Sequence, residues 1–119
     1  MNVAVVGASN KPERYSYQAV ALLAEKGHTP YPVNPFCAQI DTFQVYKQVR
    51  DIPVPVDTVT VYLSAPHQES LEEDILASHV HRVIFNPGSE NPEMAERLRS
   101  AGIDVVTACT LVMLRTGQF

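Results

Sequence analysis

Cysteines and long apolar runs are scarce in this 119-residue sequence, and each shortage excludes a class of protein. Cys37 and Cys109 are the only cysteines, and their surroundings suit neither a disulfide framework nor a zinc site. No apolar run approaches the roughly 20 residues that a membrane-spanning helix needs. The N-terminus shows no basic segment and no small-residue cleavage site, so a secretory signal is not expected. We therefore expect one cytoplasmic domain without membrane contact.

The sequence also lacks the basic surplus that nucleic-acid-binding proteins usually carry. Its formal net charge is -4, which argues against a nucleic-acid partner. Residues 1–50 hold five Lys and Arg against three Asp and Glu, whereas residues 51–119 hold four against ten. The first half is the favoured place for a small anionic ligand, and an uneven scatter without function is the alternative.

Strand-like and helix-like segments alternate along the whole chain. The short apolar or β-branched segments that predict strands are residues 2–7, 29–33, 42–45, 57–63, 82–85 and 103–106. Helices are expected over 15–26, 66–80 and 91–101, with a helical turn at 46–50 and a short tail at 110–119. This alternation implies right-handed crossovers and a parallel sheet. We predict an α/β fold, a single Rossmann-like domain over residues 1–119 with a doubly wound, parallel, five-stranded sheet of order 3-2-1-4-5.

The helix expected over 66–80 is amphipathic. Its core-facing residues are predicted to be Leu71, Ile75, Leu76 and Val80. Its water-facing residues are predicted to be the four acids Glu69, Glu72, Glu73 and Asp74.

A ligand of such a sheet binds outside the carboxyl ends of the strands, where the winding direction switches. Four segments fall at these ends: Gly7-Ala8-Ser9-Asn10-Lys11, Val33-Asn34-Pro35, Leu63-Ser64-Ala65-Pro66 and Asn86-Pro87-Gly88-Ser89. The first segment suits phosphate. Gly7 permits a tight turn, the following helix offers its N-terminal dipole, and Lys11 and Arg14 add positive charge. An ordinary capped turn is the alternative interpretation.

The glycine fingerprint of nicotinamide-dinucleotide sites is missing. That fingerprint is G-x-G-x-x-G after the first strand, with an acid at the end of the second. Here Gly7 is followed by Ala8, and Asn34-Pro35 stands where the acid would be. Both departures count against NAD.

Catalytic and metal-binding patterns are not evident. His79 and His81 form an H-x-H pair at a helix-to-strand junction, where surface histidines are the simpler interpretation, so we expect no metal site. No Ser-His-Asp or Cys-His pair can be assembled from the sequence. The nearest candidates for chemistry are Cys37 and His67, on loops after different strands.

Four elements, by their order and spacing, resemble the CoA-binding domain family, stand-alone relatives of the CoA-binding domain of the succinyl-CoA synthetase alpha subunit. These elements are V-A-V-V-G-A-S at 3–9, Val33-Asn34-Pro35, Pro55-Val56-Asp57 and Asn86-Pro87-Gly88. The resemblance implies coenzyme A or an acyl-CoA as the ligand. It places the phosphates at Ala8, Ser9, Asn10 and Lys11 and the nucleotide at Asn34 and Pro35. It places the adenosine wall at Leu63, Ser64 and Ala65, and the pantetheine exit near Asn86, Pro87 and Gly88.

Two departures from that family matter. The synthetases carry a lysine shortly after the second strand, where this sequence has Cys37, so Arg14 or Lys47 would have to substitute. The synthetases also carry a phosphorylated histidine on a second domain that this sequence lacks. We therefore expect a nucleotide-binding module that is not an enzyme on its own. The alternatives are an NAD(P)-binding redox protein, an acyl-CoA synthetase-like subunit working with a partner chain, and a nucleotide-sensing regulator.

Overall fold

Five parallel strands form the central sheet of the computed structural model, which describes all 119 residues. They are β1 (Asn2–Val6), β2 (Thr29–Val33), β5 (Thr58–Val61), β6 (Arg82–Phe85) and β7 (Asp104–Thr107), in the order β2-β1-β5-β6-β7. The helices are α1 (Tyr15–Glu25), α2 (Leu71–Ser78), α3 (Pro92–Ser100) and α4 (Thr110–Arg115). Two 3-10 turns are η1 (Val49–Asp51) and η2 (Ala65–His67). The predicted doubly wound α/β domain is confirmed.

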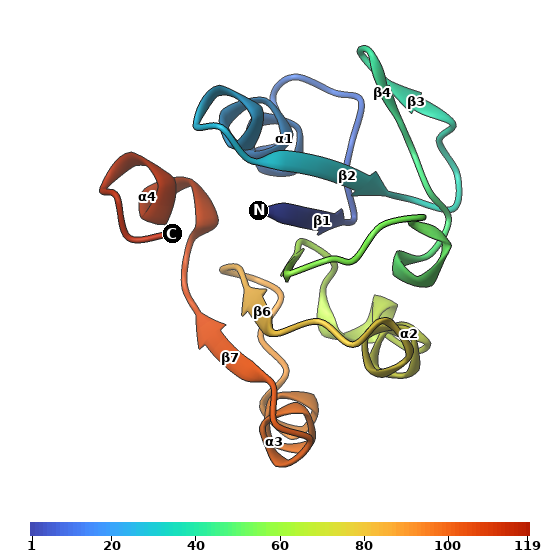
Figure 1. Ribbon diagram of the computed structural model, residues 1–119, viewed down its shortest axis with the longest axis vertical. Helices are drawn as coiled ribbons and strands as arrows, with labels where there is room; N and C mark the ends of the chain where they lie inside the picture. The colour runs from blue at the N-terminus through green and yellow to red at the C-terminus, as the bar shows by residue number, and fades with distance from the viewer.

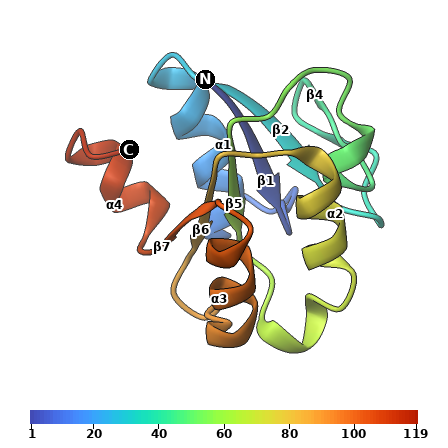
Figure 2. The same cartoon turned by 60° about the horizontal axis from the view of Figure 1, so that its bottom comes forward.

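Helices cover both faces of this sheet, α1 and α4 on one and α2 and α3 on the other (Figure 1 and Figure 2). Strand β1 divides its side chains between two cores, since Val3 and Val5 pack with α1 and α4 while Ala4 and Val6 pack with α2 and α3. All four are buried. A strand buried on both faces has no polar side, which is why it is a continuous apolar run.

The strand expected over 42–45 does not join the sheet, so the predicted order 3-2-1-4-5 is wrong at its first position. That order also leaves out the last expected strand, 103–106, which joins the opposite edge as β7. Its residues lie in a small antiparallel hairpin, β3 (Gln39–Ile40) and β4 (Phe43–Gln44). The main chain of Thr29 and Val33 bonds on the β1 side of β2, which leaves Pro30 and Pro32 on the outer edge. Proline has no N–H to offer a further strand, so pairing there stops at one bridge to Tyr46.

The second long helix begins later than its sequence pattern indicates. Residues 65–67 form η2, and α2 starts only at Leu71. Two predictions for this helix are wrong, since Asp74 is 5% exposed and Leu76 is 40% exposed. Asp74 is covered because η1 packs on that side of α2. Residues 110–119, expected to be a short tail, contain the helix α4. None of the helices has the length and apolarity needed to cross a membrane.

Candidate functional site

A cavity of about 330 Å³ opens where the carboxyl ends of β1, β2 and β5 meet. Its lining comes from four places in the chain: Val6 and Gly7; Val33, Asn34, Pro35 and Phe36; Lys47 and Gln48; and Leu63, His67, Ser70, Leu71 and Asp74. Strand β1 lies between β2 and β5, so the cavity sits at the switch in winding direction. Gly7, Asn34, Pro35 and Leu63 were among the predicted site residues.

Gly7 forms part of the wall and tolerates no side chain there. Its φ of +84° lies in the left-handed region that disfavours L side chains. A Cβ atom would lie 3.0 Å from Leu63 Cδ2 and 3.2 Å from the carbonyl carbon of Tyr62. The Gly7 amide donates to the carbonyl oxygen of Val33 at 3.0 Å, which joins the ends of β1 and β2. Glycine is therefore required at position 7 for two reasons, the positive φ angle and the lack of space beside the end of β5.

Asn34 ties together the segments around the cavity. Its Nδ2 donates to the Ala8 carbonyl oxygen at 2.8 Å, and its Oδ1 accepts from the Phe36 amide at 2.8 Å. Its own amide donates to the Tyr46 carbonyl oxygen at 2.8 Å. The Asn34 side chain is thus engaged within the protein at both ends, which gives the V-N-P sequence a structural reason besides the predicted contact with a nucleotide.

Most of the predicted phosphate loop lies outside the cavity. Ala8 is fully buried, and the Ser9 hydroxyl accepts from the Lys11 amide at 3.1 Å. Asn10, Lys11 and Arg14 are exposed. The N-terminus of α1, which follows this loop, has no side-chain cap and no acid in its first turn. No side chain of the protein therefore caps its first amides.

The loop after β5 is held by a residue that sequence reasoning missed. Gln68 is 2% exposed, and its Nε2 donates to the carbonyl oxygens of Leu63 at 2.7 Å and Ser89 at 2.8 Å. Its Oε1 accepts from Asn91 Nδ2 at 2.9 Å. A lone glutamine in a polar stretch carries no sequence signal for such a role. Of the predicted residues in this loop, Leu63 lines the cavity, while Ser64 and Ala65 lie outside it.

The predicted pantetheine exit, residues 86–88, also lies outside the cavity. Asn86 is 2% exposed and bonds to Thr60 Oγ1 at 2.7 Å, the Val61 carbonyl at 2.9 Å and the Thr110 amide at 2.8 Å. Asn86 therefore joins β5 to the start of α4. Pro87 and Gly88 are exposed.

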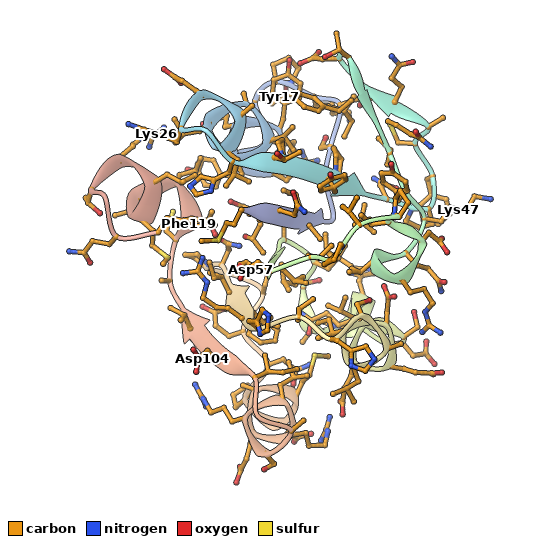
Figure 3. The ribbon with its side chains drawn as sticks, viewed as in Figure 1. Tyr17, Lys26, Lys47, Asp57, Asp104 and Phe119 are labelled. Carbon is orange, nitrogen blue, oxygen red and sulfur yellow. The ribbon has the colours of Figure 1, made fainter.

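One cation and one aromatic ring at the cavity are not engaged with other side chains of the protein. Lys47 is exposed and belongs to neither of the two ion pairs in the structure, Arg50 with Asp74 and Arg97 with Glu72. Phe36 is 96% exposed although it lines the cavity. Figure 3 shows Lys47 beyond the tip of β2. A free cation beside an exposed ring can bind a ligand that is both anionic and aromatic.

The structure brings together one serine–histidine pair that sequence reasoning did not find. Ser64 Oγ, just before the η2 turn, lies 2.8 Å from Nδ1 of His67 at the end of that turn, and His67 lines the cavity. No carboxylate bonds to His67, so the third group of a catalytic triad is missing. Cys37 bonds to the Gln39 carbonyl and does not line the cavity. No group of three or more metal-ligating side chains converges anywhere in the chain.

Comparison with known proteins gives consistent matches. Residues 1–115 match the model of a family described as CoA binding domain. A crystal structure of an uncharacterized protein superposes with a TM-score of 0.93 at 38% identity, covering 99% of this chain and 97% of that one. The uncharacterized protein YneT of Bacillus subtilis is 25% identical over 104 residues, which are 87% of this chain and 77% of that protein.

A longer relative is an enzyme subunit. The alpha subunit of acetate–CoA ligase [ADP-forming] I from Pyrococcus furiosus is 39% identical over 70 residues, which are 54% of this chain and 15% of the subunit. The similarity thus covers a small part of that subunit's length.

Proposed function

Because the chain belongs to the CoA binding domain family, we propose that it binds coenzyme A or an acyl-CoA across the carboxyl ends of β1, β2 and β5. The observation that carries this proposal is the cavity at the switch point, where an unpaired lysine and an exposed phenylalanine face the same space. Coenzyme A combines an adenine ring with several phosphate charges. It is therefore a chemical match for both features.

The phosphates have two sources of positive potential. One is Lys47 at the cavity. The other is the uncapped N-terminus of α1, with Lys11 and Arg14 exposed nearby in the chain. Amides at a helix N-terminus and mobile cations together favour a polyanion. These features support the prediction that the loop at residues 8–11 holds phosphate.

Lys47 offers a substitute for the family lysine that Cys37 replaces. Both Lys47 and Pro35 line the cavity, although they are twelve positions apart in the chain. Pro35, Phe36 and Leu63 add apolar lining to which a planar adenine ring could pack. We propose that Lys47 contributes the phosphate contact from this neighbouring segment.

The site favours binding over chemistry. Its Ser64–His67 pair lacks an orienting acid, and no metal-ligating cluster is present. An NAD-binding function receives no support after β2, because the place of the ribose-binding acid is taken by Asn34, whose Oδ1 already accepts from Phe36. Similarity to a ligase alpha subunit favours one second candidate, a CoA-binding subunit that acts with a partner chain.

Titration calorimetry of the purified chain with coenzyme A, acetyl-CoA, NAD and ADP tests the proposal. We expect coenzyme A to bind more tightly than NAD, and to stabilise the fold by about 2.7 kcal/mol at 100 times its Kd. Mass spectrometry after incubation with acetyl-CoA should show no hydrolysis above the buffer rate. Tighter binding of NAD, or thioester hydrolysis lost in a Ser64→Ala variant, would contradict the proposal.

A further inference from the structure

We infer that Asp74 is a positioning residue for the proposed coenzyme A site, acting through η1 to hold Lys47 at the cavity. The inference rests on the proposed function. It concerns a residue whose sequence pattern places it on the water-facing side of α2, yet whose side chain is 7% exposed and lines the cavity.

Both carboxylate oxygens of Asp74 accept hydrogen bonds from the start of η1. Its Oδ2 accepts from the Val49 amide at 2.7 Å, and its Oδ1 accepts from the Arg50 amide at 3.0 Å. Arg50 Nε also donates to Oδ1 at 3.2 Å. Hydrogen bonds to an ionised acceptor are among the stronger ones in proteins. Asp74 therefore holds η1 firmly against α2.

The segment just before η1 is held at its other end by β2. Tyr46 donates to the Pro32 carbonyl at 2.9 Å and accepts from the Asn34 amide at 2.8 Å. Lys47 and Gln48 are the two residues between Tyr46 and Val49, and both line the cavity. They form a two-residue bridge from β2 to α2, with one anchor on each element. Loss of the Asp74 anchor would free one end of this bridge.

The surroundings of Asp74 also explain how an acid can line a site for an anion. A buried carboxylate without partners would be unfavourable and would repel phosphate. Here two amides and the Arg50 guanidinium compensate its charge. Its oxygens are used within the protein, so a role in holding the chain fits better than direct contact with the ligand.

Electrostatics and positioning predict opposite results for Asp74→Asn. Removal of a negative charge beside an anion site should by itself tighten binding of coenzyme A. The asparagine amide, however, would point an N–H donor at a backbone N–H of η1 and release the bridge. We expect calorimetry to show coenzyme A binding weakened about tenfold, the equivalent of one charge-assisted hydrogen bond. Asp51→Asn, an exposed acid of the same turn, is the matched control and should leave affinity unchanged or slightly higher.

A double-mutant cycle identifies Lys47 as the residue through which Asp74 acts. If Asp74 works by placing Lys47, then Asp74→Asn should cause less than about a twofold further loss of affinity in a Lys47→Ala background. A full tenfold loss in that background would overturn the link to Lys47. Should Asp74→Asn not fold, Asp74→Glu carries the same test, because it keeps the charge but displaces the oxygens, and weaker binding is again expected.

The outcomes separate this inference from the proposed function. A wild-type chain that does not bind coenzyme A overturns the proposed function, and the inference with it. A wild-type chain that binds, together with a folded Asp74→Asn variant that binds equally or more tightly, overturns the positioning role alone.

Discussion

The side-chain amide of Asn34 donates to the carbonyl oxygen of Ala8 at 2.8 Å, so the end of β2 holds the loop that follows β1. Gln68 does the same for the loops after β5 and β6. Side-chain amides thus connect neighbouring strand ends around the cavity. A site held in this way loses little conformational freedom when a ligand binds, and that favours affinity.

Replacement of Asn34 by alanine should destabilise the fold and weaken coenzyme A binding together. The variant leaves the partly buried Ala8 carbonyl without its partner, whereas the exposed Phe36 amide can turn to water, and we expect a loss of about 1 kcal/mol in the free energy of unfolding. Urea denaturation and calorimetry measure the two effects. Gln44→Ala, an exposed residue of β4, is the control and should change neither. Unchanged stability in Asn34→Ala would show that these bonds contribute nothing.

Gly7→Ala should cost more stability than Gly27→Ala. Both glycines have positive φ, +84° and +88°, so an alanine is strained at either position. Only at Gly7 would the new Cβ meet neighbours, at 3.0 Å and 3.2 Å. Thermal unfolding of the two variants isolates the effect of this crowding, and calorimetry should show weaker coenzyme A binding for Gly7→Ala alone. Equal unfolding temperatures would mean that Leu63 and the β5 end move aside without penalty.

Lys47→Ala should weaken coenzyme A binding about tenfold, as expected for the loss of one charge-assisted contact. Lys26→Ala is the matched control, because Lys26 lies at the end of α1, on a different side of the molecule from Lys47 (Figure 3). The affinity of the Lys47→Ala variant should also depend less on salt, since one screened interaction is gone. Equal losses in both lysine variants would indicate an effect of net charge and would contradict a local contact.

Tyr62→Phe should leave stability unchanged or raise it by about 1 kcal/mol at neutral pH, because it removes a buried hydroxyl that has no hydrogen-bond partner. The nearby hydroxyls of Thr60 and Thr110 bond to each other at 2.8 Å. Urea denaturation at pH 7 measures the difference. A clear loss of stability would mean that the phenol oxygen makes a contact that matters.

The raised pKa of the Tyr62 phenol leads us to expect that the protein loses stability at alkaline pH. Burial, with a smaller electrostatic contribution from Cys109 and partial compensation from the nearby hydroxyls of Thr110 and Thr60, raises the pKa of Tyr62 from 10.0 to about 12. Between pH 10 and pH 12 the unfolded chain releases this proton while the folded chain retains it, so stability falls as pH rises through that window. The Tyr62→Phe variant should lose less stability than the wild type between pH 9 and pH 11. Identical slopes would contradict the raised pKa.

Local pattern was sufficient for most of the fold. The continuous apolar run at residues 2–7 and the helices with Gly27 and Gly102 just beyond them lie where expected, because burial on two faces and helix termination leave direct marks on composition. The prediction that residues 42–45 form a third strand of the sheet was wrong. The two prolines of β2 occupy the edge where that strand would pair, and local pattern does not tell which edge of β2 they occupy. Strand alternation and the general rule for ligand sites in such sheets placed the predicted site at the switch point, where the cavity lies, although the segment at 86–89 does not line it.

The sequence by itself determined the alternation of strands and helices and the glycine after the first strand, because each depends on neighbours within a few residues. The switch point at β1 followed from that alternation together with the general winding rule of such sheets. Only the tertiary structure decided which side chains meet there. Lys47 reaches the cavity through a segment held between β2 and α2, and Asp74 is buried by contact with η1, 25 positions earlier in the chain. A helical acid has the same local signature whether water or a distant pair of backbone amides satisfies it. The packing of η1 on α2 is what distinguishes the two cases.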